Sequence, residues 1–208
     1  MTPKYTHPAL YRPTSLRRRV NLSVSEAVAK INQHHSVRLQ GAARLPVLAI
    51  HAILTILTKE LDRYEGCQVL PLEHHTAADS RTNLIGDVHI LNPQGVMFEG
   101  YEIKHNIPIT SGMIQDSLEK FKTTSVRRFY ILTTHNRDDY SEFAPDIQRV
   151  TASHGCQLIL NGVDRTLLYY LRLIRDTTEF IHQYVSNLET DPSVSYQLKD
   201  AWNQIAQT

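Results

Sequence analysis

A β-hairpin predicted over residues 84–104 constrains the fold more than any other segment. The runs LIGDVHIL at 84–91 and VMFEGYEIK at 96–104 have the β-branched and aromatic content of strands, and the NPQG between them consists of turn-forming residues. Strands joined by so short a connection pair with each other in an antiparallel sheet. The chain therefore has to build a sheet around this hairpin.

Charged side chains of the hairpin gather on one of its faces. Successive side chains of a strand point to opposite faces, so Asp87, Glu102 and Lys104 all emerge on the same side. The other side receives the apolar residues, which are Val88, Ile90, Tyr101 and Ile103. We expect one face to be available for chemistry and the other to be buried, and Glu99 falls on the face away from the three charged residues.

A tight NPQG turn predicts a cross-strand register for the hairpin. Leu91 pairs with Val96 and Asp87 with Gly100, while Glu102 lies diagonally two residues further along. A glycine opposite Asp87 leaves the space above that carboxylate open to a metal ion or a phosphate. A bulge in the hairpin would change this register.

Helical and strand patterns alternate along the rest of the chain. The segment 46–66 predicts a helix because it begins with proline, ends with glycine and has apolar residues at helical spacing. Further helices are predicted at 23–35, 110–122, 141–154, 164–188 and 195–207, and further strands at 67–75, 127–134 and 156–162. The order helix, three strands, helix, strand predicts an α/β fold in which a mixed sheet is flanked by helices.

The length of 208 residues is enough for one buried core, so we expect a single domain. Within it, residues 1–45 are expected to form a basic helical N-terminal extension and residues 164–208 a helical C-terminal part. The longest apolar run, at 45–57, is too short to span a membrane, and a cytoplasmic protein is expected because no signal-like apolar stretch precedes it. Cys67 and Cys156 form no metal-binding motif, and both are expected to be reduced and buried.

Basic residues concentrate near the N-terminus, although the net charge is only +1. The first 45 residues contain eight Lys or Arg and one acid, whereas the rest of the chain contains 14 basic and 20 acidic residues. The run Arg17, Arg18 and Arg19 is the densest basic patch, and it is either a solvated surface or an arm that contacts DNA phosphates. Charge alone does not identify a nucleic-acid-binding protein.

Two carboxylates beside an amine suit the hydrolysis of a phosphodiester. Asp87 and Glu102 supply the hard oxygen ligands that Mg²⁺ prefers, and Mg²⁺ in such a site binds a phosphate oxygen and acidifies a water. Lys104 can orient or deprotonate that water and neutralise the charge that develops on the phosphate. The alternative is a solvated strand face with a cross-strand ion pair.

The pattern resembles the PD-(D/E)XK nuclease superfamily. Asp87, followed on the next strand by Glu102 and Lys104, matches the three motif positions, and the predicted element order is similar to the restriction-endonuclease-like αβββαβ core of that superfamily. Gly86 stands where the motif has proline, at a position that varies in the superfamily. The resemblance implies a metal-dependent nuclease.

Longer segments are similar to SacI-like type II restriction endonucleases over about residues 42–185. These segments are ARLPVLAIHAI, TAADSRTNLIGDVHI, YEIKHNIPITSGMIQDSLEKF and LYYLRLI. The resemblance implies Mg²⁺-dependent cleavage of double-stranded DNA at a short specific sequence, as part of a restriction-modification system. It also implies a homodimer and a companion DNA methyltransferase that protects the host DNA.

Other functions use the same fold or the same site. A catalytically silent DNA-binding or assembly module keeps the fold, and a repair, junction-resolving or modification-dependent nuclease keeps the catalytic residues. The intact set of two carboxylates and one lysine favours an enzyme over a silent module.

Glu60 is a fourth candidate for the catalytic site because it lies on the apolar stripe of its predicted helix. Superfamily members often contribute a helix carboxylate to the metal site, which this position resembles, and the alternative is an ion pair with an arginine at the edge of the core. Glu73, His74 and His75 form a rival metal cluster. Neighbouring strand residues point to opposite faces, however, so ordinary strand-end residues are favoured there.

Candidate DNA contacts flank the hairpin and the helix that follows it. They are Arg81, His105, Thr110, Ser111, Lys120, Lys122, Arg127 and Arg128, in addition to the three arginines near the N-terminus. Backbone amides at the start of a helix can meet a phosphate, but a Ser or Thr there usually only caps the helix. Basic residues at the end of a helix also complement its dipole.

Overall fold

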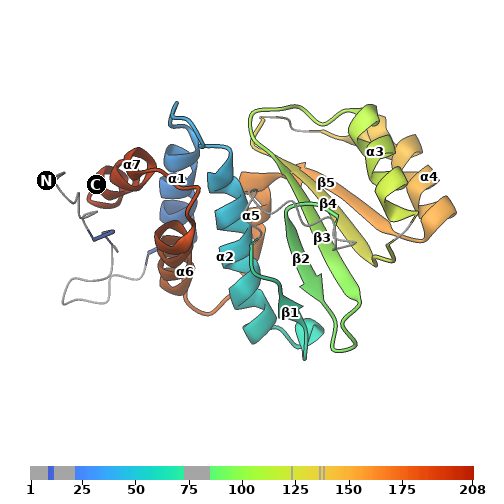
Figure 1. The fold of residues 1–208 in the computed structure, drawn as a ribbon, viewed down its shortest axis with the longest axis horizontal. Coiled ribbons are helices and arrows are strands. Elements are labelled where there is room, and N and C mark those ends of the chain that lie inside the picture. Colours follow the sequence, from blue (N-terminus) through green and yellow to red (C-terminus); the bar gives the residue numbers. More distant parts are fainter. Residues whose placement is uncertain (1–8, 12–21, 73–84, 123, 136, 138) are drawn as a thin grey trace, which may run out of the picture.

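A mixed five-stranded sheet lies at the centre of the computed structural model, which describes residues 9–11, 22–72, 85–122, 124–135, 137 and 139–208 (Figure 1). The strands are β1 (Gln68–Val69), β2 (Val88–Leu91), β3 (Met97–Lys104), β4 (Arg128–Thr133) and β5 (Gln157–Gly162), and they follow this order across the sheet. β1, β2 and β3 are antiparallel neighbours, whereas β3, β4 and β5 are parallel. The predicted α/β class with a mixed sheet is confirmed.

Helices cover both faces of the sheet (Figure 1). One side holds α1 (Val24–His35), α2 (Arg44–Glu60), α5 (Val163–Leu171), α6 (Thr177–Thr190) and α7 (Tyr196–Ala206), and the other holds α3 (Ser111–Phe121) and α4 (Ala144–His154). The 3-10 helices η1 (Asp62–Tyr64) and η2 (Ser141–Phe143) precede β1 and α4. The order α2, β1, β2, β3, α3, β4 agrees with the predicted order of helix, three strands, helix and strand.

Capping residues set the starts of α1 and α3. Ser23 accepts a hydrogen bond from the Glu26 amide, and the Glu26 carboxylate accepts one from the Ser23 amide, so α1 begins with a capping box. Thr110 accepts a hydrogen bond from the Met113 amide and starts α3. α3 can therefore begin only a short loop after β3 ends.

Some predicted boundaries are wrong. The segment 164–188 forms two helices, because the Asp176 side chain accepts the Thr178 amide and starts α6 as a new helix. The helix predicted over 46–66 ends at Glu60, where the chain enters η1. The strand predicted over 67–75 is only Gln68–Val69 within the part that the structure describes.

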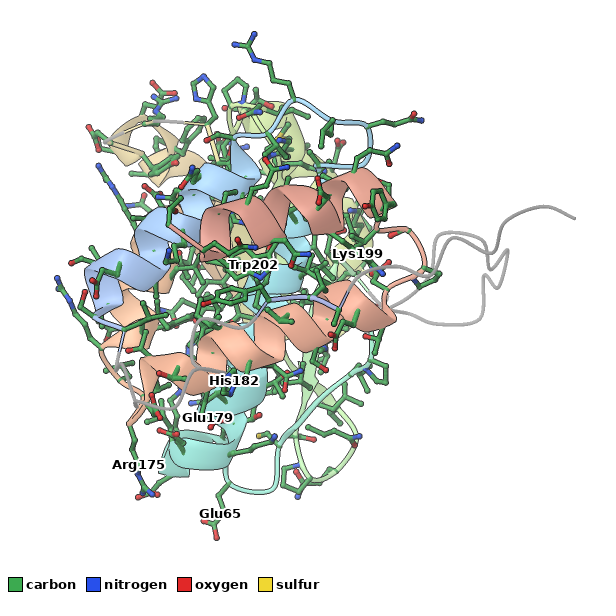
Figure 2. All side chains as sticks on the ribbon, turned by 90° about the vertical axis from the view of Figure 1, so that its left-hand side faces the viewer. Glu65, Arg175, Glu179, His182, Lys199 and Trp202 are labelled. Carbon is green, nitrogen blue, oxygen red and sulfur yellow. The ribbon has the colours of Figure 1, made fainter. Side chains whose placement is uncertain are left out.

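Two hydrophobic cores lie on the two faces of the sheet. The larger one extends from Leu10 to Ala206 and joins α1, α2, α5, α6 and α7 to the apolar face of β2 and β3. The Trp202 indole, on the inner side of α7 (Figure 2), donates a hydrogen bond of 3.1 Å to the Tyr11 carbonyl. The described residues of the predicted N-terminal extension, α1 included, are therefore part of the main core. The smaller core lies under α3 and α4.

The predictions that remain concern the two cysteines and the absence of a membrane span. Both cysteines are free, as predicted, and Cys156 is buried, which raises the pKa of its thiol to about 12. Cys67 is only partly buried, contrary to expectation. Among the described residues, no helix combines the length and apolarity that a membrane crossing requires.

Candidate active site

The predicted register of the β2–β3 hairpin is wrong by two residues, but its predicted faces are right. Asn92 pairs with Val96 across a turn closed by Gly95 in the left-handed conformation (φ 74°), and a bulge shifts the register once more between Ile90 and Leu91. Each change moves the register by one residue. Because the side-chain period is two, the two changes cancel in their effect on which face each residue occupies.

Asp87 consequently lies opposite Glu102 and not opposite Gly100. Val88 pairs with Tyr101 in β3, and the same register continued by one residue sets the two carboxylates across from each other. Val88 and Tyr101 point into the larger core, as predicted. Asp87 and Glu102 therefore share the opposite face, where directly paired residues are close neighbours.

Backbone hydrogen bonds fix the position of Asp87. Its amide donates to the Tyr101 carbonyl at 2.6 Å, and its carboxylate oxygen Oδ2 accepts the Ile103 amide at 2.7 Å. The side chain thus satisfies a strand amide of β3 at the point where β2 begins. The described residues provide no hydrogen bond to the second oxygen, Oδ1, which leaves it available to a ligand.

Glycines at positions 86 and 100 allow the strands to approach closely. Gly86 has φ 95°, and a Cβ there would lie 2.5 Å from the Tyr101 carbonyl oxygen. Proline, whose φ is held near −65°, cannot adopt this conformation. A Cβ at Gly100 would meet the Phe129 ring at 3.0 Å and the Ile85 carbonyl at 3.2 Å. Gly100 therefore serves packing, and the predicted opening above Asp87 is wrong because Gly100 pairs with His89.

Two lysines bind the carboxylate of Glu102. Lys104, on the same side of β3, donates to Oε1 at 2.5 Å, and Lys120, from the last turn of α3, donates to Oε2 at 3.3 Å. The Glu102 side chain is 16% exposed, so water screens these ion pairs only partly. The ion pair between Lys104 and Glu102 confirms the prediction that these two side chains lie on the same face of β3. The contact of Lys120 was not predicted.

The two carboxylates differ in their ionisation. Burial raises the pKa of Asp87, and the negative charge of Glu102 raises it further, although the Ile103 amide and Lys104 oppose the rise. Burial also disfavours the ionised form of Glu102, but hydrogen bonds and charge from Lys104 and Lys120 outweigh it and lower its pKa. A raised pKa beside a second carboxylate is the electrostatic situation that a bound cation relieves.

The donor set fits a hard divalent cation such as Mg²⁺. Mg²⁺ is commonly held by one or two carboxylates and keeps several waters, so Asp87 and Glu102 are sufficient protein ligands. Among the described residues, no cluster of three or more His, Cys, Asp or Glu is placed to hold a metal ion.

Glu60 does not belong to this site, so its predicted role is wrong. Its carboxylate accepts the Arg175 amide at 2.8 Å, and it borders a hollow with Glu179 and His182 of α6. Figure 2 shows Arg175, Glu179 and His182 together at one end of α6. Glu60 ends the helix that leads into β1, and β1 pairs with the turn end of β2, whereas Asp87 lies at its other end.

Some of the predicted DNA contacts follow Lys104 closely in the chain or belong to α3, whereas Arg127 and Arg128 lie at the opposite end of β3 and β4. His105 follows Lys104 directly, and its Nδ1 meets the Thr134 hydroxyl at 3.1 Å, while burial lowers its pKa. Thr110 caps α3, and Ser111 is the exposed first residue of that helix. Lys122 forms an ion pair with Glu119.

Arg127 and Arg128 lie far from the candidate site. Arg128 pairs with Glu99 near the beginning of β3, whereas Lys104 pairs with Thr133 at the other end of β4. Arg127 comes just before Arg128 in the chain, so the length of β3 and β4 separates the backbone of both arginines from Lys104. Seven other residues singled out in the sequence all lie outside the described residues: Arg17, Arg18, Arg19, Arg81, Glu73, His74 and His75.

Comparison with known proteins assigns no family. No family model matches the chain, and no curated protein matches it. The chemistry and geometry of Asp87, Glu102 and Lys104 are therefore the main indication of function.

Proposed function

We propose that the protein is a Mg²⁺-dependent endonuclease that hydrolyses phosphodiester bonds of double-stranded DNA. The observation that supports this most is the meeting of Asp87, Glu102 and Lys104 at one end of two paired strands, on the face opposite the larger core. Two carboxylates and an amine at this spacing provide both a cation site and a positive group for an anionic substrate.

Each of the three residues has a distinct task in this proposal. Asp87 and Glu102 would hold Mg²⁺, which supplies Lewis acidity toward a phosphate oxygen and a water. Asp87 is positioned by the Ile103 amide, and Glu102 by Lys104. Lys104 is 29% exposed, so its ammonium can donate a hydrogen bond to a phosphate oxygen and stabilise the charge that develops there.

The resemblance to SacI-like enzymes narrows the proposal to a type II site-specific deoxyribonuclease of a restriction-modification system. Cleavage of both strands at a short symmetric sequence is most simply achieved by a homodimer whose two-fold axis coincides with that of the DNA. A companion methyltransferase would be a functional partner and would not need to bind the nuclease. A cytoplasmic location is consistent with such a role.

Incubation with long unmethylated DNA and Mg²⁺ tests the proposal directly. We expect discrete fragments, because a sequence-specific enzyme cuts at defined sites, and no cleavage in EDTA. A smear would instead indicate a nonspecific nuclease. An intact substrate at all Mg²⁺ concentrations would refute the enzymatic proposal and favour a silent DNA-binding module.

Asp87→Asn is predicted to bind DNA more tightly than the wild-type protein in EDTA. Without a cation, the carboxylates of Asp87 and Glu102 repel a nearby phosphate, and Asn removes one negative charge while still accepting the Ile103 amide. Affinity should rise by about 5-fold, from about 1 kcal/mol of relieved repulsion. The measurement is fluorescence anisotropy at one fixed salt concentration, because salt alone changes DNA affinity.

Lys104→Met is the matched control for this prediction, since it removes a charge of opposite sign from the same site. It should not increase DNA affinity in EDTA. Equal affinities of wild-type protein and Asp87→Asn would mean that the Asp87 carboxylate does not face the DNA backbone.

A further inference from the structure

Both oxygens of the Glu102 carboxylate face an ammonium group. Lys104 occupies Oε1 at 2.5 Å, and Lys120 occupies Oε2 at 3.3 Å. Together with Asp87, the four side chains have balanced formal charges. A divalent cation that takes Glu102 as a ligand must approach an oxygen that already faces a positive group, and the two cations repel each other at this distance.

Lys120 is the lysine that can leave. Its contact with Glu102 is 0.8 Å longer than that of Lys104, as 3.3 Å compares with 2.5 Å, and its side chain is 45% exposed, compared with 29% for Lys104. Lys104 lies two residues from Glu102 on the same strand, so its position is tied to that of the carboxylate. Lys120 extends from a separate element, the last turn of α3, and can swing into solvent.

We propose that Lys120 is a metal-displaced counter-ion of Glu102 and becomes a DNA-backbone contact once a divalent cation has entered. This inference rests on the proposed function. In the metal-free protein Lys120 neutralises and orients Glu102. When the cation takes over that neutralisation, the repelled ammonium can turn from Glu102 to a phosphate of the DNA beside the cleavage site. Lys120 is thus a positioning residue that couples cation binding to DNA binding.

Mg²⁺ binding without DNA gives the first test, by isothermal titration calorimetry on the full-length protein. Lys120→Met keeps the apolar stem and removes the competing charge, so Mg²⁺ should bind about 5-fold to 10-fold more tightly. Lys122→Met is the charge-matched control, because Lys122 is two residues further along and pairs with Glu119. It should change Mg²⁺ affinity by less than about 2-fold, and Lys120→Arg should behave as wild type.

DNA affinity gives the second test, measured on a mixed-sequence duplex in Ca²⁺ and again in EDTA at constant ionic strength. Lys120→Met should weaken binding in Ca²⁺ by about 5-fold to 10-fold but change it little in EDTA, where the lysine is engaged with Glu102. Any effect of Lys122→Met should be the same in both conditions. A merely structural role of Lys120 would weaken Mg²⁺ binding and would not produce this dependence on the cation.

The outcomes separate this inference from the proposed function. Wild-type protein that binds Mg²⁺ and cleaves DNA, combined with equal Mg²⁺ affinities of Lys120→Met and Lys122→Met, would overturn the role of Lys120 alone. Wild-type protein that neither binds Mg²⁺ nor cleaves DNA would overturn both. Tighter Mg²⁺ binding by Lys120→Met, with a cation-dependent loss of DNA affinity, supports the inference.

Discussion

Glu102→Gln, Asp87→Asn and Lys104→Met are each expected to reduce DNA cleavage by at least about 1,000-fold, because each removes a charge on which metal binding or stabilisation of the phosphate depends. The three side chains lie on the face away from the larger core, and each substitution preserves approximate shape. The variants should therefore fold as wild type does. Cleavage is measured in single turnover with Mg²⁺, and folding by circular dichroism and urea unfolding.

Glu60→Gln is the matched control for Glu102→Gln. Both substitutions remove one carboxylate charge, but Glu60 accepts the Arg175 amide at the far end of α2. Within the described part of the chain, Glu60 is not among the hydrogen-bond and ion-pair partners of Asp87, Glu102 and Lys104. It should retain cleavage within about 3-fold of wild type, since surface substitutions of this kind have small effects. Near-wild-type cleavage by any of the three site variants would show that the active site lies elsewhere in the protein. Loss of cleavage in Glu60→Gln would restore the role that the sequence predicted.

The faces of the hairpin could be predicted in part from the alternation of side chains along each strand. Alternation puts Glu102 and Lys104 on one side of β3, and Asp87 joins them in the structure because the register of the two strands has the predicted parity. The register could not be predicted, because it depends on the left-handed Gly95 and on a bulge in β3. These two local backbone choices have no unique sequence pattern, and only their cancellation preserved the predicted faces.

Contacts between elements that are distant in the chain could not be predicted from the sequence. The approach of Lys120 to Glu102 depends on how α3 crosses the sheet, which no periodicity within the helix specifies. For Glu60, the spacing of apolar residues correctly indicated its position on the helix. It did not indicate which end of the sheet Glu60 lies near, because that depends on how α2 packs against α6. The break between α5 and α6 had a usable pattern, since Asp176 followed by Thr178 is typical of a helix start.

The carboxylate of Glu99, on the buried face of β3, is held by hydrogen bonds and by two arginines. Its side chain is fully buried, and it accepts hydrogen bonds from the Tyr64 hydroxyl at 3.0 Å and the Tyr101 hydroxyl at 2.7 Å. Arg63 at 2.5 Å and Arg128 at 3.4 Å neutralise its charge. The carboxylate therefore joins η1, β3 and β4 through one polar cluster inside an otherwise apolar region.

Glu99→Ala is expected to lower the free energy of unfolding by about 3 to 5 kcal/mol, because the truncated side chain leaves buried tyrosine hydroxyls and an arginine without their acceptor. Urea unfolding at neutral pH measures the loss. Glu119→Ala is the control: Glu119 pairs with Lys122 on the surface, where such a pair contributes about 0 to 1 kcal/mol. Equal losses in the two variants would show that the Glu99 cluster is not a stabilising unit.

The two glutamates of β3 should then give opposite phenotypes, because they lie three residues apart on opposite faces of one strand. Glu102→Gln should remove cleavage and leave stability near that of wild type. Glu99→Ala should lose stability, yet the fraction that remains folded should cleave DNA at close to the wild-type rate. Among the partners of Glu99, Tyr101 reaches the site through its backbone carbonyl, which accepts the Asp87 amide and is not altered by truncating Glu99. Cleavage measured per folded molecule, at a temperature where both variants are folded, distinguishes the two roles. A Glu99→Ala protein that is folded but inactive would mean that the buried cluster also positions the catalytic face.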